Sequence, residues 1–159
     1  DILVMGKAFG GGVMPITGIV ARPQLWANML ENPWILGSPT FGGNPLSCSA
    51  AIAAIKYTLE WNIPQQAAEK GAYIMNQLAV FKNKYSVLKD VRGRGLLIGM
   101  EFPTDEIGFA LAKDLFDQRI LVGGTLNNAR VIRIEPPAII SYEQIDQVLQ
   151  CLEKTLSRL

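Results

Sequence analysis

Lys7 is the first residue whose type and position could do chemistry. It follows the apolar run 2–5 and precedes three consecutive glycines at 10–12. A short apolar run of this kind is typical of a buried parallel strand, and a side chain just after such a strand can reach a ligand at the carboxyl end of a sheet. A lysine amine in a partly desolvated pocket can form an imine with an aldehyde. A surface lysine beside a flexible loop is the other interpretation, and spacing alone leaves both open.

Thr40 is the second candidate. The segment 40–45, Thr-Phe-Gly-Gly-Asn-Pro, places a hydroxyl, two glycines and a capped helix N-terminus within six residues. Exposed backbone N–H groups and the helix dipole favour an anion at such a place, and phosphate is the common choice. An ordinary entry from a loop into a helix would explain the same residues.

Arg133 is the third candidate. It lies between Ile132 and Ile134, and strand alternation would turn its side chain away from this apolar pair. The planar guanidinium group suits the carboxylate of a substrate. An internal ion pair with Glu101 or Glu135 would account for it equally well.

Residues 1–85 are expected to supply the elements around Lys7 and Thr40. Short strands are expected at 2–5 and 16–20. Asn44 followed by Pro45 predicts an N-cap and a first helical residue. The helix that follows carries Ile52, Ile55 and Leu59 at helical spacing, and a longer helix is predicted over 64–84 with the stripe Ala67, Gly71, Ile74, Leu78 and Phe81.

Residues 86–159 are expected to form a small α/β unit around Arg133. Arg92 to Gly95 predicts a turn, and strands are expected at 96–102, 120–122 and 131–135. Thr104 is expected to cap one helix, with Ile107, Leu111 and Leu115 facing inward, and Ser141 with Gln144 predicts the capping box of the last helix.

Composition excludes several classes of function. The 159 residues are 49% hydrophobic and 18% charged, which is enough apolar material for a buried core. The net charge of +1 argues against a nucleic-acid partner. The absence of histidine excludes a Ser-His-Asp triad and every histidine-containing zinc site. The longest uncharged run, 32–55, is broken by prolines and glycines, so no membrane span is expected.

Two features concern the cellular location of the protein and whether the sequence is part of a longer one. Cys48 and Cys151 lie in helical apolar patterns, so they are expected to be buried free thiols of a cytoplasmic protein. The sequence opens inside a strand-like run, so we expect it to be a piece of a longer protein. The neighbouring strands would then be missing, which would leave the face of Ile2, Val4 and Ile16 uncovered.

The three candidates lie in segments that resemble class III aminotransferases, which use pyridoxal 5'-phosphate. Residues 6–15, Gly-Lys-Ala-Phe-Gly-Gly-Gly-Val-Met-Pro, are similar to the family's cofactor-lysine segment, and residues 40–46 to its phosphate-contacting segment. Asn127-Asn128, followed by Ile-Arg-Ile-Glu-Pro-Pro at 132–137, resembles the diamine branch, in particular putrescine aminotransferases. The resemblance spans essentially all 159 residues.

The resemblance implies an α/β fold of the fold-type I class. Residues 1–85 would be the end of its large parallel-sheet domain, and residues 86–159 its small C-terminal domain. Lys7 would bind the cofactor as a Schiff base and shuttle a proton, and Thr40 would contact the phosphate of the cofactor in the other subunit of a homodimer. Arg133 would bind the carboxylate of an amino acid or of 2-oxoglutarate. The implied reaction moves an amino group from a diamine or ω-amino compound to a 2-oxo acid.

The sequence also departs from the family pattern. Pro39 stands where the family usually has a small hydroxylated residue, and the family's pyridine-binding aspartate, stacking aromatic residue and main phosphate loop would all lie upstream of Lys7. Three alternatives therefore stay open: an acetylornithine- or ornithine-type aminotransferase, an isomerase similar to glutamate-1-semialdehyde aminomutase, and a fragment without catalytic activity. The Phe-Gly-Gly triplet at 41–43 favours the transaminase over the isomerase.

Overall fold

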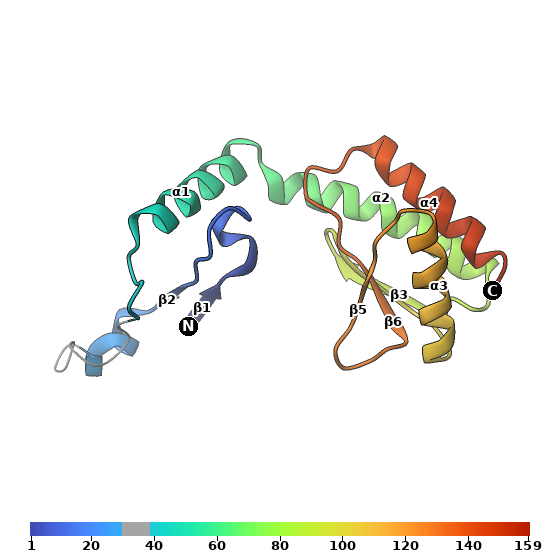
Figure 1. Cartoon of the computed structure of the whole chain (residues 1–159), viewed down its shortest axis with the longest axis horizontal. Helices are drawn as coiled ribbons and strands as arrows, with labels where there is room; N and C mark the ends of the chain where they lie inside the picture. Colours follow the sequence, from blue (N-terminus) through green and yellow to red (C-terminus); the bar gives the residue numbers. More distant parts are fainter. Residues whose placement is uncertain (30–38) are drawn as a thin grey trace. The chain divides into compact units, whose positions relative to one another are not determined.

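The computed structural model describes residues 1–29 and 39–159, which form a mixed α/β structure (Figure 1). The described residues divide into two compact units, Asp1–Trp61 and Asn62–Leu159. We call them unit 1 and unit 2 and describe each by itself. The boundary at 85/86 that the resemblance implies concerns the domains of the family, and it stays a prediction.

Unit 1 contains a two-stranded sheet, two 3-10 helices and one α-helix. Strands β1 (Ile2–Met5) and β2 (Gly18–Ala21) pair antiparallel, with Val4 opposite Ile19. The 3-10 helix η1 (Lys7–Gly10) follows β1 directly, and η2 (Pro23–Met29) follows β2. The α-helix α1 (Pro45–Glu60) packs against η1.

The prediction of a parallel strand at 2–5 is wrong for the pairing that this structure shows. The chain reverses direction between β1 and β2, and the connection contains the four-residue η1 rather than the crossover helix that usually joins parallel strands. The uncovered face is confirmed for Ile2 and Val4, whose exposed fractions are 62% and 70%. Ile16 differs, because it is half-buried and lies before β2 rather than within it.

Helix α1 begins where its cap predicts, but its expected apolar stripe is uncovered. The side chain of Asn44 caps the helix, and Pro45 is its first residue. Ile52, Ile55 and Leu59 are nevertheless exposed, and Ala51 is the residue of α1 that is buried. Helical spacing identified the helix correctly, whereas the described residues leave this stripe exposed.

Unit 2 is a four-stranded antiparallel sheet with three helices. The strand order is β3-β4-β6-β5. The elements in chain order are α2 (Ile63–Lys84), β3 (Asp90–Arg94), β4 (Leu97–Glu101), α3 (Asp105–Asp117), β5 (Gly123–Gly124), β6 (Val131–Ile134) and α4 (Tyr142–Leu156).

The core of unit 2 lies between the helices and one face of the sheet. The predicted stripe of α2 is largely confirmed, because Gly71, Ile74, Leu78 and Phe81 are buried and Ala67 is half-buried. Both predicted helix starts are also confirmed: Thr104 accepts a hydrogen bond from the amide of Ile107, and Ser141 and Gln144 form a capping box. The sheet and the other helices contribute Ile98, Met100, Ile132, Ile134, Leu111, Leu115, Ile145, Leu149, Leu152 and Leu156.

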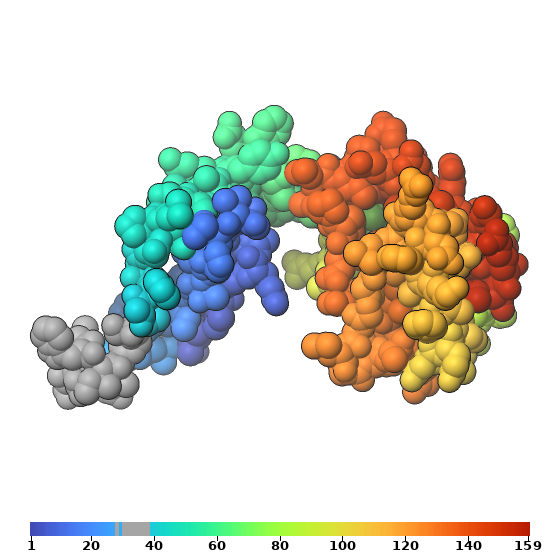
Figure 2. Space-filling view, in the orientation of Figure 1, coloured from blue at the N-terminus to red at the C-terminus, as the bar shows by residue number. Residues whose placement is uncertain are grey.

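Helices α3 and α4 lie side by side, as the yellow-orange and red atoms of the space-filling view show (Figure 2). Asp114 of α3 joins them, because its carboxylate accepts hydrogen bonds from the hydroxyl of Thr155 (2.5 Å) and from the guanidinium group of Arg158 (3.3 Å). Thr155 is a buried polar residue, so this contact satisfies a hydroxyl that water does not reach.

Two predicted elements of unit 2 are wrong. Arg92, Gly93 and Arg94 are not a turn but lie in β3, and the reversal comes at Gly95, whose φ is +55°. The strand expected at 120–122 is instead the two-residue β5 at 123–124, which pairs with β6. The positions of β3 and β5 therefore follow backbone pairing with β4 and β6, respectively, rather than side-chain type.

Cys48 and Cys151 are both free thiols, but each is half-buried rather than buried as expected. No helix within the described ranges is long and apolar enough to cross a membrane.

Gly71 tests the packing of α2 on the hairpin between β3 and β4. A Cβ atom at position 71 would overlap the backbone carbonyl of Gly95. Gly to Ala normally stabilises a helix interior by about 1 kcal/mol. We expect Gly71→Ala to do the opposite and to lower the free energy of unfolding by about 1–3 kcal/mol, because a rigid backbone group must move. Urea denaturation of the whole chain measures it.

Asn76→Ala on the exposed side of α2 is the matched control, and we expect it to be neutral or slightly stabilising. A Gly71→Ala variant as stable as this control would contradict the close approach of helix and hairpin.

Candidate functional site

Lys7 occupies an unusual backbone conformation. Its φ is +55°, in the left-handed region that few non-glycine residues adopt. Such a conformation costs of order 1–3 kcal/mol and persists only where the surrounding structure holds it, which happens most often at functional sites. The side chain is exposed, and its amine has no hydrogen bond or ion pair with any residue that the structure describes.

Two close contacts hold the turn of Lys7 in place. The ring of Phe9 lies against Gly18 of β2, where an added Cβ would come within 3.2 Å of it. Gly11, with φ +66°, lies against Ala54 of α1, where an added Cβ would be in ordinary contact at 3.4 Å. Lys7 is thus an exposed residue of a turn that is fixed on both sides by small residues.

The segment of Thr40 forms a tight turn before α1. The amide of Gly42 donates to the carbonyl of Pro39 (2.9 Å), and the amide of Asn44 donates to the carbonyl of Phe41 (3.2 Å). Thr40 is exposed, and neither its hydroxyl nor its amide has a hydrogen-bond partner among the described residues. The hydroxyl and amide of Thr40 are therefore available to a ligand.

The expectation that the N-terminus of α1 offers free N–H groups is wrong. The side-chain oxygen of Asn44 accepts from the amides of Leu46 (3.0 Å) and Ser47 (3.2 Å), and the carbonyl of Asn44 accepts from the amide of Cys48. Pro45 has no N–H. Because the cap occupies these donors, an anion here would be bound by the turn at Thr40 rather than by the first turn of the helix.

A cavity of about 630 Å³ lies within unit 1, between the segment after the glycines and the start of α1. Residues 14–17 and 41–44 line it, together with Pro39, Ser47 and Cys48. Neither Lys7 nor Thr40 lines it.

Arg133 lies on the sheet face of unit 2 opposite the core. Ile132 and Ile134 are buried and Arg133 is half-buried, so the predicted alternation is confirmed. Its Nε donates to the carbonyl of Gly124 (2.9 Å), and its Nη2 forms an ion pair with Glu135 (3.2 Å). Of the two acids considered from the sequence, Glu135 is thus the partner. Nη1 has no partner among the described residues and stays available.

The two glycines of β5 make room for this guanidinium group. A Cβ at Gly123 would lie 3.3 Å from Nη2 of Arg133 and 3.1 Å from the carboxylate of Glu135. Glycine at this position therefore lets Arg133 fold across β5. Sequence reasoning missed both glycines as part of the site, since they were expected to follow a strand rather than to form one.

An open groove of about 440 Å³ lies on the same sheet face. Three arginines line it, Arg92, Arg94 and Arg133, and no acidic residue does. The remaining lining residues are Gly93, Leu97, Ile98, Gly99, Thr125, Asn127, Asn128 and Val131. The arrangement suits a small anion. The sequence held a signal for it, because residues 92, 94 and 133 share a face once 90–94 is recognised as a strand.

Arg92 is the most strongly paired of these arginines. Its Nη1 contacts Glu101 (2.6 Å) and Asp90 (2.8 Å), and these hydrogen bonds raise the pKa of the guanidinium group. The hydrogen bond from Arg92 lowers the pKa of the Asp90 carboxyl group, and the hydrogen bond from Lys82 lowers it further by a smaller amount. The two acids do not line the groove, but their contacts offset much of the charge of Arg92.

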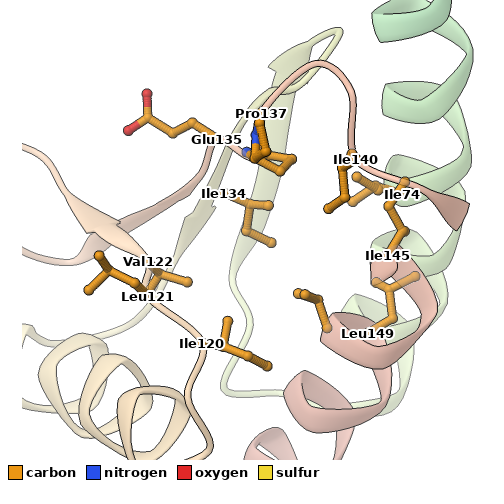
Figure 3. Close-up of a pocket in the computed structure, with 12 residues that line it drawn as sticks. Ile74, Ile120, Leu121, Val122, Ile134, Glu135, Pro137, Ile140, Ile145 and Leu149 are labelled. Atoms are coloured by element: carbon orange, nitrogen blue, oxygen red, sulfur yellow. The ribbon is translucent and has the colours of Figure 1, made fainter. Parts of the chain in front are cut away.

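A second cavity, of about 200 Å³, lies inside unit 2. It is smaller than the groove and, unlike the groove, apolar. Ile74, Ile120, Ile134, Ile140, Ile145 and Leu149 surround it, whereas the carboxylate of Glu135 points away (Figure 3). Since the side chains that face this space are hydrocarbon, it offers no group that could act on a substrate.

Unit 1 carries Lys7 and Thr40, and unit 2 carries Arg133. Within the described ranges, no group of three or more cysteine, aspartate or glutamate residues is arranged to hold a metal ion.

Comparisons with known proteins agree with the two α/β units. Residues 1–156 match the family described as Aminotransferase class-III. Two similar solved structures are an ornithine aminotransferase from Toxoplasma gondii ME49 (31% identity, TM-score 0.90) and an acetylornithine aminotransferase from Elizabethkingia anophelis (31%, 0.85). A Bacillus anthracis aminotransferase (22%, 0.91) shares the fold.

The chain is covered almost completely in each comparison, at 99%, 100% and 100%, but it spans only 37%, 41% and 39% of the matched chains in the same order. Class III aminotransferases use pyridoxal 5'-phosphate and have the fold-type I architecture. The family match over nearly the whole sequence shows that this chain belongs to the class III aminotransferases.

Proposed function

We propose that this chain is the C-terminal part of a pyridoxal-phosphate-dependent aminotransferase. The enzyme would move an amino group from a diamine or ω-amino compound, such as putrescine, to a 2-oxo acid such as 2-oxoglutarate. The observation that carries the proposal is the backbone of Lys7, which is held in the left-handed region directly after β1. A costly conformation at an exposed lysine indicates a residue positioned for chemistry.

The residues around Lys7 fit this cofactor. The amine is exposed and has no partner among the described residues, and the adjacent glycines allow a planar ring to approach the backbone. Pyridoxal phosphate, when bound, supplies an aldehyde and an electron sink. Lys7 would hold the cofactor through its Nζ, and the same atom would carry a proton to and from the substrate carbon.

Thr40 would contribute its hydroxyl and amide to the phosphate. The turn of Lys7 meets α1 at Ala54, whereas Thr40 lies before the cap Asn44. Ten residues of helix separate those two places, a distance of roughly 15 Å. This separation supports a homodimer in which Thr40 of one copy contacts the cofactor held by Lys7 of the other.

Arg133 would bind the carboxylate of the 2-oxo acid. Its free Nη1 and the groove beside it offer a charged hydrogen bond, and the carbonyl of Gly124 fixes the direction of the guanidinium group. A diamine has no carboxylate and would not need this contact. The proposed substrates therefore differ in their dependence on Arg133.

A second candidate for the amino donor is ornithine or acetylornithine. The two solved structures at 31% identity are aminotransferases of these types, which favours a donor that carries its own carboxylate. Turnover of the full-length enzyme with putrescine, cadaverine, ornithine, acetylornithine and 4-aminobutyrate separates these donors. An isomerase would differ from all of them, because it needs no external 2-oxo acid.

Both cysteines are free thiols, which supports the cytoplasmic location that we propose for the enzyme. The chain by itself is proposed to be inactive, since the residues that the family uses for the pyridine nitrogen, the ring face and the main phosphate loop would have to come from the rest of the protein.

Lys7→Ala tests the role of the lysine in the full-length enzyme. We expect loss of covalent cofactor attachment and a fall in transamination of at least the 10²–10⁴-fold typical of losing general acid–base catalysis. Borohydride reduction followed by peptide mass spectrometry locates the attached pyridoxyl group. Lys56→Ala on α1, also an exposed lysine of unit 1, is the control and should leave both properties unchanged. A pyridoxyl group still attached to the Lys7→Ala variant would rule out this assignment.

Arg133→Lys tests the carboxylate contact. The variant keeps the charge but loses the guanidinium fork, so we expect the half-reaction with 2-oxoglutarate to lose about 1.5–3 kcal/mol of binding. The half-reaction with a diamine should be unaffected. Single-turnover kinetics of each half-reaction measure the two effects, with Arg130→Lys as the control. Equal losses in both halves would show that Arg133 is structural.

A further inference from the structure

The apolar cavity of unit 2 adjoins an open groove that has a polar rim. The cavity measures about 200 Å³ and the groove about 550 Å³. Both spaces are lined by Ile120, Pro137, Ile140 and Val148, so they are neighbours. Figure 3 shows the first three of these residues around the cavity. We call the outer space the Arg119 groove, after a further residue that lines it.

The cavity has the size and the walls to hold a hydrocarbon group. Ile74, Ile145 and Leu149 line it and are buried. Glu135 also belongs to the lining, but its carboxylate points away and pairs with Arg133 (Figure 3). An apolar cavity of about 150 Å³ stays free of water and binds benzene, because water finds no polar partner in it and its walls lack contacts. A group of that size would therefore fill this cavity favourably.

Arg119 is the charged residue among the described residues that line the groove. It is exposed, and its guanidinium group has no hydrogen bond or ion pair with any residue in the ranges that the structure describes. Gln118 beside it differs, because its amide group donates to Asp114 (2.9 Å) and to Thr155 (3.0 Å). The guanidinium group of Arg119 is therefore available to an anion.

The backbone of Arg119 brings this charge next to the cavity. Its φ is +65°, its amide donates to the carbonyl of Phe116 (2.8 Å), and the amide of Ile120 donates to the carbonyl of Leu115 (2.9 Å). These two hydrogen bonds form a Schellman motif at the end of α3, in which glycine is the usual residue at the left-handed position. Arginine is less stable there than glycine, which indicates a use for its side chain. Since Ile120 lines the cavity, the charge and the hydrocarbon wall come from consecutive residues.

We infer that the cavity and the Arg119 groove together bind a small amphipathic monocarboxylate. Its hydrocarbon group, about the size of a benzene ring, fills the cavity, and its carboxylate accepts hydrogen bonds from the guanidinium group of Arg119. Apolar walls with few polar groups that fix the orientation are typical of small-molecule sites. Ile134 of β6 lines the cavity, whereas Arg133 lies on the opposite face of the sheet, so this ligand does not use the contact proposed for Arg133.

Three ligands test the two halves of the site on the whole chain. Phenylpropionate has a ring and a carboxylate, phenylpropanol has the ring alone, and propionate has the carboxylate alone. Titration followed by NMR measures their affinities. We expect saturable binding of phenylpropionate and none of propionate. Phenylpropanol should bind about tenfold more weakly or less well still, as for the loss of a hydrogen bond to a charged group. Nuclear Overhauser effects between the ring and the methyl groups of Ile140 and Leu149 would place the ring in the cavity.

Arg119→Gly removes the guanidinium group while keeping the fold, because glycine suits the left-handed position. We expect it to weaken phenylpropionate about tenfold or more and to leave phenylpropanol unchanged. Arg119→Gln should have the same effect on both ligands. The matched control is Arg130→Gln, which removes the same charge at an exposed arginine of unit 2 that lines neither space, and it should change neither affinity.

Several outcomes would overturn the inference. Absence of saturable binding of phenylpropionate would do so, and so would equal effects of Arg119→Gln and Arg130→Gln. Equal affinities for phenylpropionate and phenylpropanol would rule out the carboxylate contact, and ring contacts with methyl groups outside the cavity would rule out the apolar one. Binding to this chain that is lost in the full-length enzyme would show that another part of the protein covers the cavity instead of a ligand.

Discussion

The alternation of side chains along β6 couples the hydrophobic core of unit 2 to its polar face. Ile132 and Ile134 are buried under the helices, so Arg133 between them must point to the other side of the sheet. A shift of register by one residue would bury the guanidinium group and expose both isoleucines. The free energy that buries this apolar pair therefore also fixes the direction of the candidate substrate-binding residue.

The neighbouring strands complete this arrangement by having no side chains in the same row. Gly99 on one side of Arg133 and Gly123 on the other are its register partners. Gly123 lets the guanidinium group fold across β5, where the carbonyl of Gly124 and the carboxylate of Glu135 hold it. Gly99 leaves the other side open. The two glycines thus have different effects. Gly123 makes room for the guanidinium group of Arg133, and Gly99 leaves the space on its other side open.

The sequence predicted those features that depend on local chemistry. The caps at Asn44, Thr104 and Ser141 and the apolar stripe of α2 need only near neighbours in the chain, and the structure has them. The alternation around Arg133 is equally local.

Features that depend on pairing with distant residues were not predictable in this way. The strand β5 consists of two glycines, which have low strand propensity and become a strand only through their hydrogen bonds to β6. Arg92 to Gly95 carries turn residues, yet β4 extends the first three of them into a strand. Likewise, only the strand pairing shows that Glu101 of β4 is engaged by Arg92 of β3, whereas Arg133 pairs with Glu135.

The two units hold their site residues by different means. Arg133 is fixed by a core whose residues, such as Ile98 and Met100, have no exposed surface. The turn of Lys7 is instead fixed by Phe9 on Gly18 and by Gly11 on Ala54, while Ile2 and Val4 of the preceding strand stay exposed. Exposed apolar strands are typical of surfaces that another part of a protein covers. A strained backbone persists only where its surroundings hold it, so such a cover over β1 would stabilise the conformation of Lys7. The position of the Arg133 side chain, by contrast, depends only on residues of unit 2.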